Sequence, residues 1–322
     1  MMNNPLILIG ESIHASIPKT REVMKQLNQL GPDAYSKPSG ALDYVKALIK
    51  SQAENGANYI AVNVDAFGED NPQVAINMMI EYVRLVRRWS NGVPICIDSS
   101  NDDVLIAGLK EWYNTDKPIK PPLINSIKIY SIDKIGPFKK DYDYDFVGLL
   151  ISQEGSGKQA SLQSVDELYS LAKQIFQLAV SKYDFRPQQI FFDSTVFPLV
   201  IDMPMTAGVP SYTYRAFETI KKIKSDPQMK GVHCLLGISN SVQDLPGRKI
   251  GVARAYLAKA MEYGLDAAIV NVAHRYGQVE PDPELLELVD AYAKMDGSAE
   301  KTNKAMMLMS KFCQRCRESI QP

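Results

Sequence analysis

The amino-acid sequence predicts a closed (β/α)8 barrel, the TIM-barrel arrangement, as a single α/β domain with a C-terminal helical extension. About eight short apolar runs alternate with segments of helical periodicity. The runs are continuous rather than alternating in hydrophobicity, as expected for a parallel sheet that helices cover. Nearly every run also ends on a polar residue, whereas an open doubly wound sheet would gather such residues at one switch point.

The predicted strands are short apolar runs, most of them bounded by polar or turn-forming residues. They lie at residues 6–9, 59–64, 94–99, 123–127, 145–151, 190–192, 233–238 and 267–272. Since consecutive parallel strands need a crossover between them, a helix is expected in most of the intervals.

The early helices are predicted by apolar residues at helical spacing over residues 41–54, 72–89 and 102–112. The second has Asn71 as its N-cap and Pro72 at its first position, and Ser100 or Asn101 caps the third. The stretch between the first strand and residue 41 is polar and is expected to be irregular. No long helix is evident between the fourth and fifth strands.

The later helices are expected over residues 165–181, through residues 217–223, and over residues 250–263 and 283–293. Gly264 ends the third of these. Residues 1–297 would then form the barrel. The Lys- and Met-rich segment 298–322 is expected to be an appended helix that packs on the barrel or on another subunit.

The composition of the 322 residues is that of a globular protein, with 45% hydrophobic and 23% charged residues. The 36 basic and 37 acidic residues give a net charge of −1, so there is no overall attraction to nucleic acid or to an anionic membrane. No apolar run approaches the roughly 20 residues of a membrane span, and no signal peptide is evident. These observations predict a soluble, cytoplasmic protein.

The four cysteines do not suggest a disulfide framework. Cys96 and Cys234 lie inside apolar strands, where a buried thiol is the usual state. Cys313 and Cys316 form a Cys-Gln-Arg-Cys pair, but a structural zinc site needs four ligands and no second pair stands nearby. An inert helical tail is favoured over a metal or redox site.

Polar residues at the strand exits are the main functional signal. A carboxylate at the end of an apolar strand is costly to desolvate and therefore needs a ligand or a partner. The candidate residues are Glu11, Asn63, Asp98, Asn125, Asp193 and Asn240.

This set suits a neutral heterocycle with several N–H donors, such as a pterin. A carboxylate, here Asp98 or Asp193, can accept two parallel N–H bonds from the amidine-like edge of the ring. The amides of Asn63, Asn125 and Asn240 can both donate and accept, which suits the mixed edge of a reduced pterin.

Three other interpretations of these residues remain open. Asp and Asn commonly cap the loops and helices that follow strands. A divalent cation would find oxygen ligands in Asp65, Glu69, Asp98 and Asp193, although no ligand spacing singles out such a site and the histidines are scattered. Phosphate binding is disfavoured because the segment Gly-Ser-Gly-Lys at residues 155–158 is too short for a P-loop.

The sequence resembles the pterin-binding methyltransferases over about residues 6–272. This family includes the methyltetrahydrofolate:corrinoid methyltransferases and the folate domain of cobalamin-dependent methionine synthase, and dihydropteroate synthase is a more distant member. The matching pieces occur in order: Ile-Gly-Glu at 9–11, Asn63, Ile-Asp-Ser at 97–99, Leu-Ile-Asn-Ser at 123–126, Phe-Asp at 192–193, Gly-Ile-Ser-Asn at 237–240, Leu-Pro-Gly-Arg at 245–248 and Gly-Leu-Asp-Ala-Ala-Ile at 264–269.

The resemblance implies that Asp98, Asn125 and Asp193 hold the pterin ring and that Asn240 hydrogen-bonds near N5. The implied reaction is methyl transfer between N5 of tetrahydrofolate and the cobalt of a corrinoid, or cobalamin, that a partner protein carries. A homodimer and no protein-bound metal are expected. A dihydropteroate-synthase-like enzyme, a metal-dependent enzyme and a non-catalytic folate-binding protein remain as alternatives.

The chain departs from the family pattern around these residues. Ser12 and His14 stand where relatives commonly have Arg and Asn, and Asp65 replaces a common glycine. Ala61 stands where an acid often occurs, and Ser194 replaces the usual proline. The changes leave the pterin set intact but alter its surroundings, so folate binding is a firmer expectation than the identity of the methyl partner.

Overall fold

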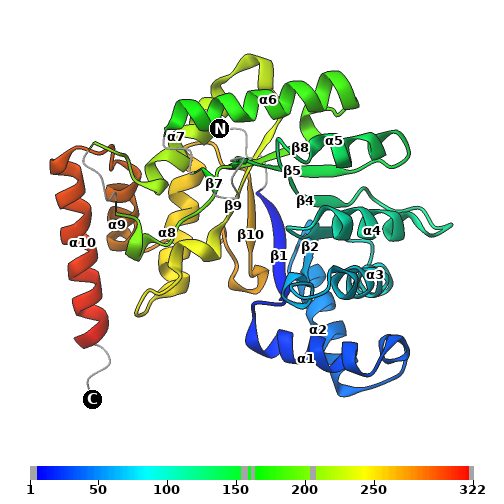
Figure 1. Cartoon of the computed structure of the whole chain (residues 1–322). Helices are drawn as coiled ribbons and strands as arrows, with labels where there is room; N and C mark the ends of the chain where they lie inside the picture. The colour runs from blue at the N-terminus through cyan, green and yellow to red at the C-terminus, as the bar shows by residue number, and fades with distance from the viewer. Residues whose placement is uncertain (1–5, 154–158, 161–163, 204–207, 319–322) are drawn as a thin grey trace.

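Eight parallel strands close into a barrel in the computed structural model, which describes residues 6–153, 159–160, 164–203 and 208–318 (Figure 1). The order around the barrel is β1, β2, β3, β4, β5, β8, β9 and β10, which confirms the predicted (β/α)8 fold. The barrel strands are β1 (Ile7–His14), β2 (Tyr59–Asn63), β3 (Ile95–Asp98), β4 (Leu123–Ile127), β5 (Asp145–Leu149), β8 (Ile190–Asp193), β9 (His233–Gly237) and β10 (Ala267–Val270). A separate antiparallel pair is formed by β6 (Ser152–Gln153) and β7 (Gln159–Ala160).

Helices surround this barrel (Figure 1). The α-helices are α1 (Pro18–Gln29), α2 (Gly40–Glu54), α3 (Pro72–Trp89), α4 (Asp102–Tyr113), α5 (Ile132–Ile135), α6 (Val165–Tyr183), α7 (Tyr212–Ser225), α8 (Lys249–Glu262), α9 (Pro283–Ala293) and α10 (Ala299–Glu318). Short 3-10 turns are η1 (Pro32–Tyr35), η2 (Asp65–Phe67), η3 (Gly136–Lys140), η4 (Pro187–Gln189), η5 (Leu199–Ile201), η6 (Pro227–Met229), η7 (Ile238–Val242) and η8 (Val272–His274).

The predicted irregular stretch after the first strand is wrong. Strand β1 continues to His14 with a register shift between Gly10 and Ile13, and helix α1 follows it. The buried residues of α1 are only Thr20, Met24 and Leu27, about one for each helical turn. The apolar residues Val23, Met24 and Leu27 do recur at helical spacing, but they are few and stand among polar residues, which is why the stretch was expected to be irregular.

Helix caps are placed as the sequence predicts. Asn71 Oδ1 accepts a hydrogen bond from the backbone N–H of Gln73 at 3.0 Å, and Pro72 begins α3. Asn101, rather than Ser100, caps α4 by accepting from the backbone N–H of Asp103 at 2.8 Å. Between β4 and β5 the only α-helix is the four-residue α5, so the expected absence of a long helix in this fully described segment is confirmed.

The interior of the barrel is filled by an apolar layer to which each barrel strand contributes one buried side chain, and Ile7, Tyr59 and Ile269 pack against it. The eight buried side chains are those of Ile9, Ala61, Cys96, Leu123, Val147, Phe191, Leu235 and Ala267. Ala61, which stands where relatives often have an acid, is thus part of the packed interior. Since this layer closes the barrel, polar side chains of the strands gather at its ends.

Helix α10 stands at one side of the molecule beside α9 (Figure 1). It is held there by Ala305, Met309, Phe312 and Cys316, which are buried. All four cysteines are free thiols. Within the described part of the chain, no helix is long and apolar enough to cross a membrane.

Candidate functional site

Three of the predicted site residues lie side by side at the carboxyl ends of neighbouring strands. Asn63 of β2 pairs in register with Asp98 of β3, and Asp98 pairs with Asn125 of β4. His14, the last residue of β1, pairs with Asn63 on the other side. The parallel register therefore places four polar side chains at one level of the barrel mouth.

Asp98 is the most strongly perturbed of these groups. It is partly buried, and its pKa is raised from 3.8 to about 7. Burial is the largest cause, and the negative charges of Asp65 and Asp193 add to it. A hydrogen bond with the Asn63 side chain and the positive charge of Lys128 act in the opposite direction. The carboxyl group is therefore divided between its two protonation states near neutral pH.

Asp193 lies at the end of β8, beside Leu149 and Leu235 in register. Burial raises its pKa to about 6, although its Oδ1 accepts a hydrogen bond from the backbone N–H of Thr195 at 2.7 Å. Its charge contributes to the raised pKa of Asp98, so the two carboxyl groups share one electrostatic environment at the mouth.

Asn125 and Asn240 present amides that are free of protein hydrogen bonds to any described residue. Asn125 is partly buried at the end of β4, and Asn240 is exposed on η7, directly after β9. Glu11 lies near η7, since its Oε2 accepts a hydrogen bond from Ser239 Oγ at 2.9 Å. Burial raises the pKa of Glu11, partly offset by hydrogen bonds from Ser239 and from the backbone of Asn271.

Loop capping explains part of the polar set but not all of it. Asn63 Oδ1 accepts from the backbone N–H of Asp65 at 3.1 Å, and Asp193 caps its own turn through Thr195. The Asn63 side chain also forms a hydrogen bond with Asp98, so the same residue caps the turn and contacts the central carboxylate. For Asp98, no such backbone bond is found within the described chain. The carboxylate at the centre of the register therefore has no capping role in this structure.

Asp65 joins the turns that follow β2 and β3. Its Oδ1 accepts from Ser99 Oγ at 2.5 Å, and its Oδ2 accepts from the backbone N–H and Oγ of Ser100 at 2.7 and 2.8 Å. Both oxygens are thus satisfied by the protein. The acid that replaces the family glycine is a structural tie that also adds negative charge beside Asp98.

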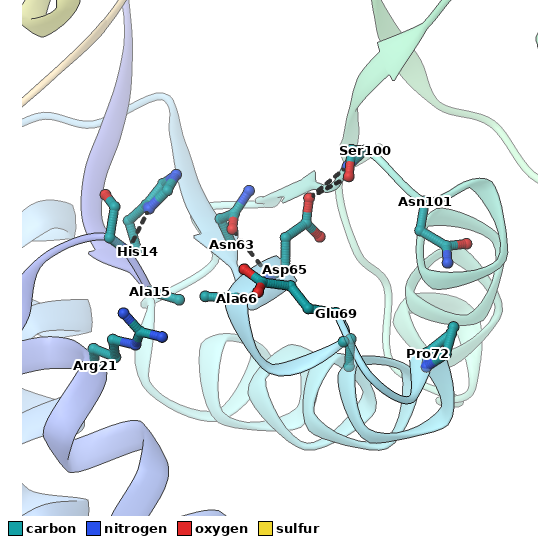
Figure 2. Close-up of a pocket in the computed structure, with 13 residues that line it drawn as sticks. His14, Ala15, Arg21, Asn63, Asp65, Ala66, Glu69, Pro72, Ser100 and Asn101 are labelled. Carbon is teal, nitrogen blue, oxygen red and sulfur yellow. Dashed lines mark hydrogen bonds between the residues drawn. The ribbon is translucent and has the colours of Figure 1, made fainter. Parts of the chain in front are cut away.

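A pocket of about 550 Å³ opens beside Asn63, between the exits of β1, β2 and β3 (Figure 2). Its described lining is mostly polar or small: His14, Ala15, Ser16, Arg21, Asn63, Asp65, Ala66, Gly68, Glu69, Pro72, Ala75, Ser100 and Asn101. Of the predicted site residues, only Asn63 belongs to this lining. Two of the departures from the family pattern, His14 and Asp65, do belong to it.

His14 is neutral at physiological pH in this environment. Burial lowers its pKa, and the charge of Asp65 only partly opposes that effect. Its Nδ1 accepts a hydrogen bond from the backbone N–H of Ser16 at 3.0 Å, so the ring proton resides on Nε2. The imidazole therefore presents a single N–H donor at the edge of the pocket.

Two charged residues near the mouth were missed by the sequence analysis. Arg21 reaches the pocket from α1, the helix that was not predicted (Figure 2). Lys128 follows β4 directly and is buried, with 5% of its surface exposed. A lysine between Ile127 and Ile129 in an otherwise apolar run was the signal that would have identified it.

The alternative of a protein-bound metal gains no support here. Among the residues described, no group of three or more His, Cys, Asp or Glu side chains is arranged to hold a metal ion. The segment 155–158, considered above for phosphate, lies outside the described residues.

Comparison with known proteins adds a family assignment. A family model described as pterin binding enzyme matches residues 24–271, well over half of the chain. Among solved structures, the chain resembles a Yersinia pestis DHPS with a pterine-sulfa conjugate, at 11% identity and a TM-score of 0.48, over 97% of this chain and 93% of that one.

It also resembles dihydropteroate synthase from Thermus thermophilus, at 14% identity and a TM-score of 0.44, over 74% of this chain and 86% of that one. These structural similarities are too distant to support any statement about the reaction. The family assignment therefore rests on the family model. Its match spans seven of the eight barrel strands, from β2 to β10. The chain belongs to the pterin-binding enzyme family.

Proposed function

We propose that this protein transfers a methyl group between N5 of tetrahydrofolate and the cobalt of a corrinoid carried by a partner protein. The observation that carries the proposal is the register of Asn63, Asp98 and Asn125 at the barrel mouth, where an uncapped carboxylate stands between two amides. Membership of the pterin-binding family supports the choice of ring.

Recognition of the pterin falls to the carboxyl groups and the adjacent amides. Asp98, when ionised, accepts two N–H bonds from N3 and the 2-amino group. The free amide of Asn125 donates to and accepts from the opposite edge, and Asp193 holds the far side of the ring. Desolvation of these groups strengthens each hydrogen bond once the ring excludes water.

The chemical step requires an electron pair to return to N5. In transfer from folate to corrinoid, reduced cobalt supplies the pair of the new cobalt–carbon bond, while the pair of the N5–carbon bond stays on N5. That nitrogen then takes a proton, which solvent supplies. Asn240, whose amide has no bond to another described residue and lies at the rim, stabilises the developing state by hydrogen bonding near N5.

The partner has to approach from the open mouth, because the apolar layer closes the barrel below it. The exposed position of Asn240 on η7 is compatible with an N5 that faces this opening. A homodimer is part of the proposal.

The test is a spectroscopic assay of methyl transfer. The protein is mixed with methyltetrahydrofolate and reduced free cobalamin, and formation of methyl-cobalt is followed in the visible spectrum. We expect transfer by the wild type, a loss of about a hundredfold or more in Asn240→Ala, and unchanged transfer in Asn114→Ala. Asn114 is a matched control because it ends α4, at the opposite end of the barrel.

The other outcomes separate the alternatives. Tight folate binding without transfer to cobalamin or to a cognate corrinoid protein would identify a non-catalytic folate-binding protein. Condensation of a pterin pyrophosphate with p-aminobenzoate would identify a synthase instead. Metal-dependent activity without folate affinity would overturn the assignment of both ring and reaction.

A further inference from the structure

Lys128 is a buried cation with few partners. The residue directly follows β4, and only 5% of its surface is exposed. Its Nζ donates one long hydrogen bond, 3.4 Å, to the backbone carbonyl of Ser100. No carboxylate oxygen in the described part of the chain lies within the 4.0 Å of an ion pair with it. A buried ammonium that is not neutralised by a direct pair is costly, so its position needs an explanation.

The backbone places this ammonium beside the central carboxylate of the mouth. Asp98 pairs in register with Asn125, three residues before Lys128, and the backbone N–H of Ser99 donates to the carbonyl of Asn125 at 2.8 Å. The hydrogen bond to Ser100 then anchors the Lys128 head two residues beyond Asp98. The lysine and the carboxylate are thus held by the same pair of neighbouring strand exits.

We propose that Lys128 is a positioning residue for pterin recognition, whose charge favours the ionised form of the Asp98 carboxyl group, the form that accepts the two N–H donors of the ring. The inference rests on the proposed function, because it assumes that Asp98 binds the pterin edge. Lys128 would act through Asp98 and would not need to contact the ring.

The charges around Asp98 explain why such a cation is needed. Asp65, from the turn after β2, and Asp193, from β8, both disfavour ionisation of Asp98, and burial disfavours it further. The Asn63 side chain and Lys128 oppose them. A protonated Asp98 would present an O–H donor toward ring N–H groups and lose the paired acceptor geometry. The pKa of about 7 is the balance of these effects.

Lys128 itself is placed among three acids. Burial lowers its pKa, while the charges of Asp102, Asp65 and Asp98 raise it. Asp102 is also approached by the Lys134 ammonium at 3.8 Å. Lys134 is therefore a matched control: it pairs with Asp102 and Asp103 in the same region and is half-exposed, but it is not among the main charges that shift the pKa of Asp98.

The experiment measures binding of methyltetrahydrofolate by calorimetry between about pH 5.5 and about pH 9 for the wild type, Lys128→Met, Lys128→Arg and Lys134→Met. In the wild type, affinity should rise with pH and level off above the pKa of Asp98. In Lys128→Met, the midpoint should move to higher pH, with about tenfold weaker binding on the acidic side for each pH unit of displacement. The two affinities should converge at the alkaline end.

Lys128→Arg should restore the wild-type midpoint, and Lys134→Met should not move it. An unchanged midpoint in Lys128→Met would overturn the proposal, as would a uniform loss of affinity at every pH, because either result would leave the charge without effect on Asp98. A wild type that binds no folate would instead overturn the proposed function. The titration of the ligand is common to all four proteins and does not alter the comparison.

A second measurement needs no ligand and does not require that the protein folds with one particular substitution at Lys128. The pKa of the Asp98 carboxyl group is measured in the free protein from the 13C NMR signal of its carboxyl carbon. The Asp98→Asn variant assigns this signal. A higher pKa in Lys128→Met, or in Lys128→Gln if the methionine variant does not fold, supports the role. An equal pKa in a folded variant contradicts it.

Discussion

Replacing Asp98 with asparagine should make the protein more stable at alkaline pH while it abolishes pterin recognition. The carboxyl group has a pKa of about 7 in the folded protein and 3.8 in a solvated chain, so the folded state binds more protons between these values. Stability of the wild type therefore falls as pH rises from about 4 to about 7. Asparagine has no charge to desolvate and removes this loss.

The size of the effect follows from the two pKa values. Each pH unit between them is worth about 1.4 kcal/mol, so the full difference is about 4 kcal/mol. About 3 kcal/mol of it accumulates between pH 5 and pH 8. Because the side chain is partly exposed and shares its field with Asp65, Asp193 and Lys128, solvent and neighbouring charges reduce the figure. We expect about 1 to 3 kcal/mol.

The assay is urea unfolding at about pH 5 and about pH 8, followed by both circular dichroism and tryptophan fluorescence to check for a single transition. The change in unfolding free energy on Asp98→Asn should be more favourable at pH 8 than at pH 5 by the expected amount. This comparison between two pH values cancels any pH-independent loss, such as that of the hydrogen bond to Asn63.

Asp290→Asn on α9 is the matched control, because its charged partners are lysines rather than a histidine. Burial alone would raise the pKa of Asp290, but bonds with Lys294 and Lys259, at 2.6 and 3.2 Å, lower it overall. Its stabilising contribution is therefore present above its ordinary pKa and is lost only at more acidic pH. Asp290→Asn should destabilise the protein about equally at both pH values. An Asp98→Asn variant that behaves in the same way would refute the reasoning.

Two further substitutions test the fold. Gly10→Ala should lower the free energy of unfolding by about 1 to 3 kcal/mol, because an added Cβ would clash with Oε1 of the buried Gln52. Chemical denaturation measures this loss, and an unchanged free energy of unfolding would contradict the close packing. Glu111→Gln should cost about 2 kcal/mol at neutral pH, because Glu111 is buried and pairs at 3.0 Å with both Arg84 and Arg87. Burial raises the pKa of Glu111 and the bonds to the two arginines lower it, with a lowered pKa as the net result. The cost of Glu111→Gln should therefore shrink as the pH falls below 4.5, the ordinary pKa of a glutamate. A cost that stays constant in that range would argue against the ion pairs.

The barrel was predictable from the sequence because its strands are buried on both faces. Continuous apolar runs such as those of β3 and β4 are visible without any knowledge of their neighbours. Helix α1 was missed because its apolar residues are few and stand among polar ones, although they recur at helical spacing. Its position depends on β1 extending to His14, and a register shift within that strand is a property of pairing rather than of composition.

The candidate site was likewise predictable only in part. The polar residues at strand exits were identifiable because a carboxylate or amide interrupts each apolar run, as Asp98 and Asn125 do. That Asn63, Asp98 and Asn125 stand in one register could be expected from the closed parallel sheet. The ionisation of Asp98 could not be predicted, since it depends on Asp65, Asp193 and Lys128, which follow or end strands other than β3.

The sequence by itself therefore determined the fold class, the order of the strands and the chemical types of residue at the barrel mouth, because these follow from local hydrophobicity and from the end of each run. Only the tertiary structure decided which acids are held near neutral pKa, that Asp65 is a tie between turns, and that Lys128 is buried beside Asp98. The physical reason is that desolvation and charge interactions act through space. Their strength is set by neighbours far apart in the chain, which no local pattern records.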